Sequence, residues 1–98
     1  MPTESNLSKK LARRIRDRGG WARKIAGGPA SAGLPDIVGC YKRYGLWIET
    51  KLPGKERTLT ALQAATLADI KRAGGIAVMI TTMAQLDRVL DRIDELSP

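Results

Sequence analysis

The chain has 98 residues, 43% of them hydrophobic, and a formal net charge of +7. This length is enough for one small domain with a single core, spanning residues 1–98, and excludes two such domains. One cysteine, Cys40, and no histidine exclude an intramolecular disulfide, a zinc cluster and histidine-based catalysis. Any bound metal must therefore have oxygen ligands, which favours Mg²⁺ or Mn²⁺.

Basic residues are concentrated near the N-terminus. Residues 1–24 hold eight Lys and Arg against two acids, whereas the remainder holds nine against eight. Such a basic face favours a polyanion, with nucleic acid ahead of an acidic membrane surface; the alternative is a merely solvated helix face. No apolar run reaches the roughly 18 residues of a membrane span, and no signal-peptide core is present. The protein is expected to be soluble, intracellular and cytoplasmic.

The chain begins with a predicted amphipathic helix. Thr3 is its candidate N-cap, and apolar residues recur every four positions from Leu7 to Ile15. Glu4 lies over this apolar side, and spacing alone favours a first-turn acid stabilised by the helix dipole. Residues 21–26 are predicted to form a short strand. The glycine-rich loop that follows lacks the Lys-Ser/Thr ending of a phosphate-binding motif.

Two further strands, joined by a turn around residues 42–45, carry charged residues within apolar runs. Asp36 opens the first strand, and alternation along the second places Glu49 and Lys51 on one face. The two carboxylates would repel each other unless a divalent cation neutralised them. Such an ion could promote phosphodiester hydrolysis, and Lys51 is the candidate nitrogen base that would help to deprotonate the attacking water. The alternative is an exposed Glu49–Lys51 pair worth under about 1 kcal/mol.

The second half of the chain predicts a helix, a strand and a helix. The first helix, residues 59–73, contains Gln63 within its apolar stripe; a capping box with Thr60 explains Gln63 without a function. Residues 76–80 are typical of a buried strand. The order is therefore α-β-β-β-α-β-α, an α/β fold. The apolar stripes of the two helices are Leu59, Leu62, Ile70 and Ala73, and Leu86, Leu90 and Ile93.

Four short motifs together resemble a known nuclease family. Pro35-Asp36 with Glu49-Thr50-Lys51 resembles the PD-(D/E)xK signature, and the finer resemblance is to the virus-type replication-repair nuclease module, VRR-NUC, of the stand-alone phage and prophage type. This resemblance implies a restriction-endonuclease-like α-β-β-β-α-β core, with a mixed central sheet flanked by helices, plus a C-terminal helix. The matching segments are Glu4, Gly33-Leu34-Pro35-Asp36, Glu49-Thr50-Lys51 and Thr60-Ala61-Leu62-Gln63.

The resemblance also implies a role for each site residue. Asp36 and Glu49 would bind Mg²⁺ or Mn²⁺ together with the main-chain carbonyl of Thr50, and Lys51 would be the catalytic lysine. Glu4 would supply a further acid, directly or through water. Gln63 would align Lys51 or the substrate. Thr50 departs from the family pattern, in which an apolar residue is usual.

The implied activity is metal-dependent, structure-selective DNA endonuclease cleavage, a hydrolase acting on branched DNA such as Holliday junctions in DNA repair. The resemblance further implies a homodimer in a bacterial or phage-infected cell. The alternatives are a non-catalytic nucleic-acid-binding module and, less favoured, a sequence-specific restriction-type nuclease. The expected DNA backbone contacts are Lys9, Lys10, Arg13, Lys24, Lys42, Arg43, Lys55 and Arg57.

Overall fold

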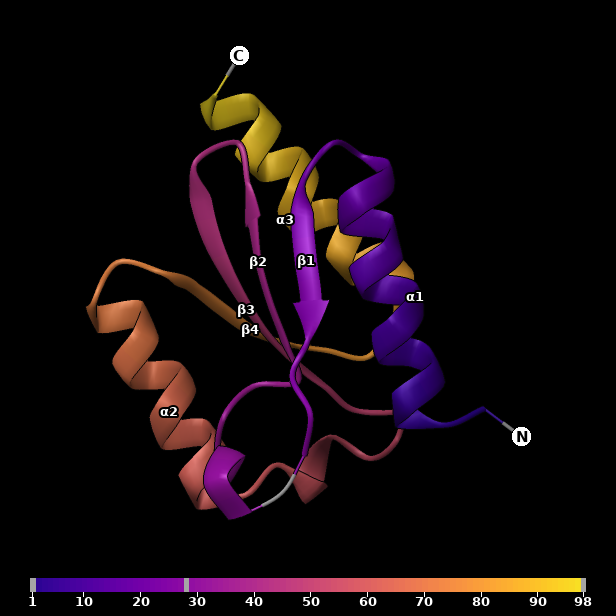
Figure 1. Ribbon diagram of the computed structural model, residues 1–98, viewed down its shortest axis with the longest axis vertical. Helices are drawn as coiled ribbons and strands as arrows, with labels where there is room; N and C mark the ends of the chain where they lie inside the picture. Colours follow the sequence, from indigo (N-terminus) through magenta and orange to yellow (C-terminus); the bar gives the residue numbers. More distant parts are fainter. Residues whose placement is uncertain (1, 28, 98) are drawn as a thin grey trace.

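A computed structural model describes residues 2–27 and 29–97, and its helices and strands follow the predicted order α-β-β-β-α-β-α (Figure 1). The predicted α/β fold, with a four-stranded mixed sheet and three helices, is confirmed. Two short 3₁₀ helices lie in the connecting loops. The elements are α1 (Glu4–Asp17), β1 (Trp21–Lys24), η1 (Pro29–Ser31), β2 (Ile37–Tyr41), β3 (Tyr44–Thr50), η2 (Glu56–Thr58), α2 (Ala61–Arg72), β4 (Ile76–Ile80) and α3 (Met83–Leu96).

The sheet has the strand order β1-β2-β3-β4. The first three strands form an antiparallel meander, and β4 runs parallel to β3 because α2 carries the chain back between them. A two-residue turn joins β2 to β3: Lys42 and Arg43 both have positive φ, as a tight hairpin of this hand requires. The register pairs Ile37 with Ile48 and Glu49 with Met79.

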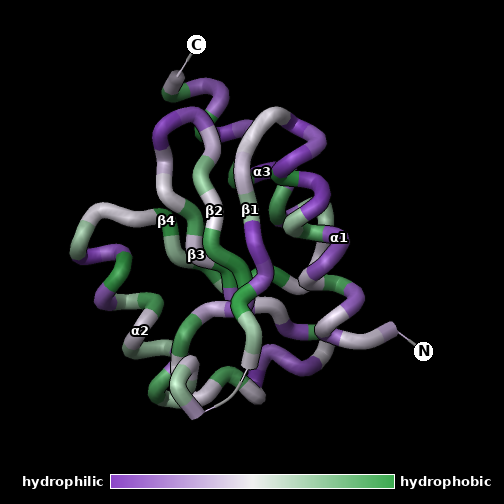
Figure 2. The backbone as a smooth tube through the Cα atoms, viewed as in Figure 1, coloured by the Kyte–Doolittle hydropathy of each residue, from purple (hydrophilic) through white to green (hydrophobic). Residues whose placement is uncertain are grey.

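One face of the sheet packs against α1 and α3 and holds the main core. Leu11 and Ile15 of α1 and Leu86 and Leu90 of α3 are fully buried there, against the inward side chains of β2, β3 and β4. Stretches of β2, β3 and β4 accordingly appear as strongly hydrophobic in Figure 2, whereas the lower part of β1 is hydrophilic. The predicted inward stripe of the last helix is confirmed, since Ile93 is also buried.

The opposite face of the sheet is covered only in part. Helix α2 packs on β4 and β3. On β1 and β2 the same face carries the exposed side chains of Trp21, Arg23 and Cys40. The sheet therefore has one closed face and one face that is open over half of its width.

The predicted apolar stripe of α2 is wrong in detail. Leu62 is 56% exposed and Ala73 is also exposed, whereas Leu67 is the buried residue of this helix. The helix covers only the β3–β4 half of the sheet, so among its residues only Leu67, near its centre, is buried against the strands. Leu62 instead lies against the loop before β2, where a Cβ on Gly33 would come within 2.5 Å of its Cγ.

The N-caps of the helices agree with the sequence. The Thr3 hydroxyl accepts a hydrogen bond from the backbone N–H of Asn6, and Thr60 and Gln63 form the predicted capping box at the start of α2. The first strand is shorter than predicted, ending at Lys24 rather than residue 26, because its pairing with β2 ends at Ile37. No helix in the described part of the chain is long and apolar enough to span a membrane.

Candidate active site

The end of the β2–β3 hairpin brings together three of the predicted site residues. Asp36 lies directly before β2, Glu49 is near the end of β3, and Lys51 follows that strand. The Asp36 Oδ2 atom accepts a 2.8 Å hydrogen bond from the backbone N–H of Thr50, which ties the two strand ends together. The Lys51 Nζ atom lies 4.0 Å from Oε1 of Glu49. These side chains share the partly open face of the sheet.

Burial excludes the interpretation of Glu49 and Lys51 as a solvated surface pair. Glu49 is only 2% exposed, Thr50 is fully buried and Lys51 is 7% exposed. Helix α2 packs over the end of β3, so this part of the sheet face is not exposed to solvent. The Oε2 atom of Glu49 and the hydroxyl of Thr50 are buried without a hydrogen-bond partner among the described residues, and such groups are costly and call for a specific explanation.

The electrostatic environment of Glu49 opposes its ionisation. Burial, then the negative charge of Asp36 and a smaller contribution from Glu4, together raise the pKa of Glu49 to about 7. Lys51 opposes this shift because its positive charge favours the carboxylate. At neutral pH the Glu49 carboxyl is therefore poised between its neutral and charged forms, and a bound cation or a proton would relieve its repulsion from Asp36.

Gln63 occupies two roles at once. Its Oε1 atom accepts a 2.9 Å hydrogen bond from the backbone N–H of Thr60, which completes the capping box. Its Nε2 atom donates a 3.1 Å hydrogen bond to Oε1 of Glu49. Gln63 is therefore both a capping residue and a contact of the candidate site. Its hydrogen bond goes to Glu49, whereas the resemblance implied Lys51 or the substrate as its partner.

Two carboxylates, Asp36 and Glu49, are the residues that can hold a metal at this place. They offer oxygen ligands suited to Mg²⁺ or Mn²⁺, and the unpartnered Oε2 atom of Glu49 fits such a ligand role. Within residues 2–27 and 29–97, no group of three or more acidic or cysteine side chains is close enough to hold a metal. A metal bound here would therefore take its further ligands from the main chain, such as the Thr50 carbonyl that the resemblance implies, and from water.

Glu4 lies at the start of α1 and is half-buried. Its charge reaches Glu49 strongly enough to raise the pKa of that carboxyl. It does not complete a three-carboxylate group with Asp36 and Glu49.

A cavity of about 230 Å³ opens beside Asp36 and Gln63. Its other walls come from residues 25–27 and 31–35, the glycine-rich loop, which sequence reasoning treated only as a connection. In the sequence, the position of this loop directly before Pro35 and Asp36 was the feature that could have indicated its place beside the site. Gly33 adopts a φ of +79° and leaves no room for a Cβ beside Leu62, so the loop conformation depends on glycine.

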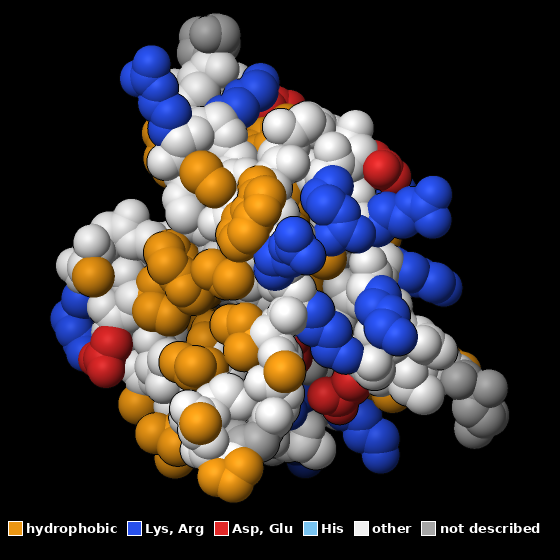
Figure 3. All heavy atoms as spheres, viewed as in Figure 1, with side chains coloured by type: hydrophobic (Ala, Val, Ile, Leu, Met, Phe, Trp, Pro, Cys, Tyr) orange, Lys and Arg blue, Asp and Glu red, His pale blue; other side chains and the backbone are white. Residues whose placement is uncertain are grey.

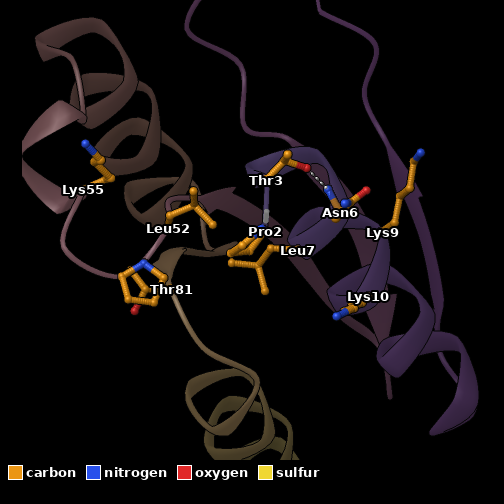
Figure 4. Close-up of a pocket in the computed structure, with 10 residues that line it drawn as sticks. Pro2, Thr3, Asn6, Leu7, Lys9, Lys10, Leu52, Lys55 and Thr81 are labelled. Atoms are coloured by element: carbon orange, nitrogen blue, oxygen red, sulfur yellow. Dashed lines mark hydrogen bonds between the residues drawn. The ribbon is translucent and has the colours of Figure 1, made fainter.

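The predicted DNA contacts do not all lie at one place. A cavity of about 670 Å³ lies between the start of α1 and the chain that follows Lys51, and three predicted contacts line it: Lys9, Lys10 and Lys55. Figure 4 shows this cavity, with Leu52 between Lys55 and the two lysines of α1. Lys24 is also near this end, since its Nζ atom donates to the hydroxyl of Ser5.

The other predicted contacts are more scattered. Lys42 and Arg43 form the turn at the opposite end of the hairpin. Lys42 is also paired with Asp94 at 2.8 Å. Arg13 and Arg57 are exposed, and Arg13 lies 3.7 Å from Asp17. The structure therefore does not bring Lys42 and Arg43 to the carboxylates.

Comparison with protein-family models and with curated protein sequences found no match for this chain. The candidate site is accordingly defined by its own geometry: a buried carboxylate, a second carboxylate on the adjacent strand, a buried lysine and an amide that holds the first carboxylate in place.

Proposed function

We propose that this protein is a divalent-metal-dependent, structure-selective DNA endonuclease with a restriction-endonuclease-like core, similar to VRR-NUC modules. One observation carries the proposal: Glu49 is buried with one oxygen unpartnered, beside both Asp36 and Lys51. A structural role alone gives no reason to place an acid and a lysine at the end of a buried strand.

Each residue has a separate task in this proposal. Asp36 and Glu49 hold Mg²⁺ or Mn²⁺, whose chemistry is to activate water and to stabilise the negative charge that develops on the scissile phosphate. Lys51 is only 7% exposed, so its ammonium is held near Glu49 and can orient a water molecule or neutralise charge on the phosphate. Gln63 fixes the orientation of Glu49 through its 3.1 Å hydrogen bond. Glu4 supplies a further acid, directly or through water.

The basic surface supports DNA as the substrate. Figure 3 shows Lys and Arg side chains gathered over α1 and β1, next to a region of hydrophobic side chains and with acidic side chains at the lower edge of the basic region. Lysines at the 670 Å³ cavity beside the chain segment after Lys51 are positioned to contact phosphates. Contacts of this kind read charge and shape rather than base sequence, which supports structure selectivity over restriction-type recognition. Paired cleavage of a branched junction would further require a homodimer.

The test is cleavage of end-labelled four-way, flap and linear duplex DNAs in EDTA, Mg²⁺ or Mn²⁺. The parent protein is compared with Lys51→Ala and with Lys71→Ala, which removes the same charge from an exposed position of α2. The proposal expects cutting that needs metal and Lys51, is confined to branched DNA, and persists in Lys71→Ala. Binding without cleavage of any substrate would favour the non-catalytic module instead, and discrete cut sequences in random DNA would favour a restriction-type enzyme.

A further inference from the structure

An exposed tryptophan lies on the same sheet face as the candidate carboxylates. Trp21 pairs with Cys40 and Arg23 pairs with Val38. Because side chains alternate along a strand and paired residues share a face, these residues and Asp36 project from one side of the sheet, the side opposite the buried Ala22.

Helix α2 does not cover this part of the sheet, and Trp21 is 51% exposed. Exposure of so large an apolar side chain calls for an explanation. Its surroundings are basic. Arg16, Trp21, Ala22 and Arg23 line a shallow cavity of about 390 Å³, and the Nη1 atom of Arg16 donates a 3.0 Å hydrogen bond to the Ala22 carbonyl, which holds the guanidinium beside the strand.

Arg23 is exposed and makes no ion pair within the described residues. This differs from Arg14 and Arg18, whose guanidinium groups are paired with aspartates of α3. The positive charges of Arg23, on the open face, and of Arg16, at the outer edge of β1, therefore remain available to an anionic ligand. Proteins bind unpaired nucleotides with an aromatic ring on which a base stacks and with cations that contact the phosphates. An exposed tryptophan flanked by arginines offers both.

We infer that Trp21 is a stacking platform for an unpaired base and that Arg16 and Arg23 contact the adjoining phosphates. Along β2 the four-residue step from Cys40, opposite Trp21, to Asp36 covers roughly 13 Å. A single strand lying over this face would thus extend from Trp21 across Arg23 toward the carboxylates. Resting on the proposed function, this inference defines the substrate as DNA with a single-stranded segment beside the cleavage point, such as a flap or a splayed branch, rather than a fully paired duplex.

The test measures binding in EDTA, which separates it from cleavage. The probes are a fluorescein-labelled oligothymidylate of about 12 nucleotides and a blunt duplex of the same length. Trp21→Ala should weaken oligothymidylate binding by about 5- to 100-fold, the loss expected for one stacked base, and leave duplex binding nearly unchanged. Trp21→Phe should retain most of the affinity because a ring remains.

Two matched variants serve as controls. Leu96→Ala truncates an equally exposed apolar side chain at the end of α3, and Arg88→Ala removes an exposed arginine from the same helix. Neither should change oligothymidylate binding, whereas Arg23→Ala should weaken it and reduce its salt dependence.

Equal losses on both probes, or no loss in Trp21→Ala, would overturn the stacking platform. A change in sedimentation mass on Trp21→Ala would also overturn it, because Trp21 would then be a contact between protein copies. If the parent cuts no DNA in Mg²⁺ or Mn²⁺ while Trp21-dependent oligothymidylate binding holds, the proposed nuclease fails and the stacking platform stands.

Discussion

The Nε2 atom of Gln63 donates a 3.1 Å hydrogen bond to Oε1 of Glu49, so the first turn of α2 is fastened to the end of β3. The same amide caps the helix through its oxygen. A helix terminus and a candidate metal ligand therefore depend on one side chain, and the position of α2 fixes the orientation of the carboxylate.

Replacing Gln63 by Ala removes both interactions. We expect the free energy of unfolding to fall by about 1 kcal/mol, the usual value of a helix cap, and metal-dependent cleavage to fall about 10- to 100-fold, as for other residues that orient metal ligands. Thermal melts and initial cleavage rates measure the two effects. Gln85→Ala is the matched control, since Gln85 completes the capping box of α3 without contacting the carboxylates. Equal cleavage losses in both variants would remove the special role of Gln63.

The raised pKa of Glu49 predicts a stability that depends on pH. Because the folded pKa of about 7 exceeds the usual value of 4.5, folding favours the protonated carboxyl, and the stability present below pH 4.5 is lost as pH rises through 7. The metal-free protein should therefore melt at a lower temperature at pH 8 than at pH 5. Glu49→Gln should reduce this difference, and Mg²⁺ or Mn²⁺ should raise the melting temperature of the parent at pH 8 but not that of the variant. A parent melting temperature that rises steadily over this range would contradict the prediction.

The ion-pair cluster between α1, β2 and α3 predicts the opposite behaviour in acid. Asp94 accepts hydrogen bonds from Tyr41 at 2.7 Å and Arg18 at 2.8 Å and pairs with Lys42 at 2.8 Å. These partners, Lys42 first, lower the pKa of Asp94 from 3.8 to about 2. Because the folded pKa is depressed, the stabilisation present above pH 4 is lost as pH falls through 2.

Asp94→Asn should consequently lower the melting temperature at pH 7 and have little effect near pH 2. Asp91→Asn is the control, because the Asp91 side chain is 63% exposed and, among the described residues, forms an ion pair with Arg18 alone. Thermal melts of both variants across this pH range make the comparison. If Asp91→Asn were the more damaging change at pH 7, the central role of Asp94 would be incorrect.

Gly33 sets the loop that leads to Asp36. Gly33→Ala should destabilise the fold by more than the roughly 1–2 kcal/mol cost of a left-handed alanine, because the new Cβ would also displace Leu62. Gly54→Ala carries the same backbone cost at a φ of +87° with no atom within 4 Å. The difference between the two in urea unfolding isolates the Leu62 contact, and Gly33→Ala alone should also slow cleavage. Equal unfolding energies would show that Leu62 moves aside freely.

Much of the fold follows from local pattern. The order of helices and strands, the Thr3 and Thr60 caps and the inward stripe of α3 all depend on short-range spacing and hydrogen bonding, and the structure confirms them. The alternation along β3 likewise placed Glu49 and Lys51 on one face, since side-chain period along a strand is a local property.

How these residues are used depends on the packing of elements that are distant in the sequence. Burial of Glu49, and hence its raised pKa, depends on α2 covering the end of β3, which no local pattern specifies. The inward residue of α2, Leu67 rather than Leu62, depends on where that helix crosses the sheet. Local sequence pattern thus specifies which side chains share a strand face. The packing of distant elements specifies which of them are desolvated, and desolvation is what changes their chemistry.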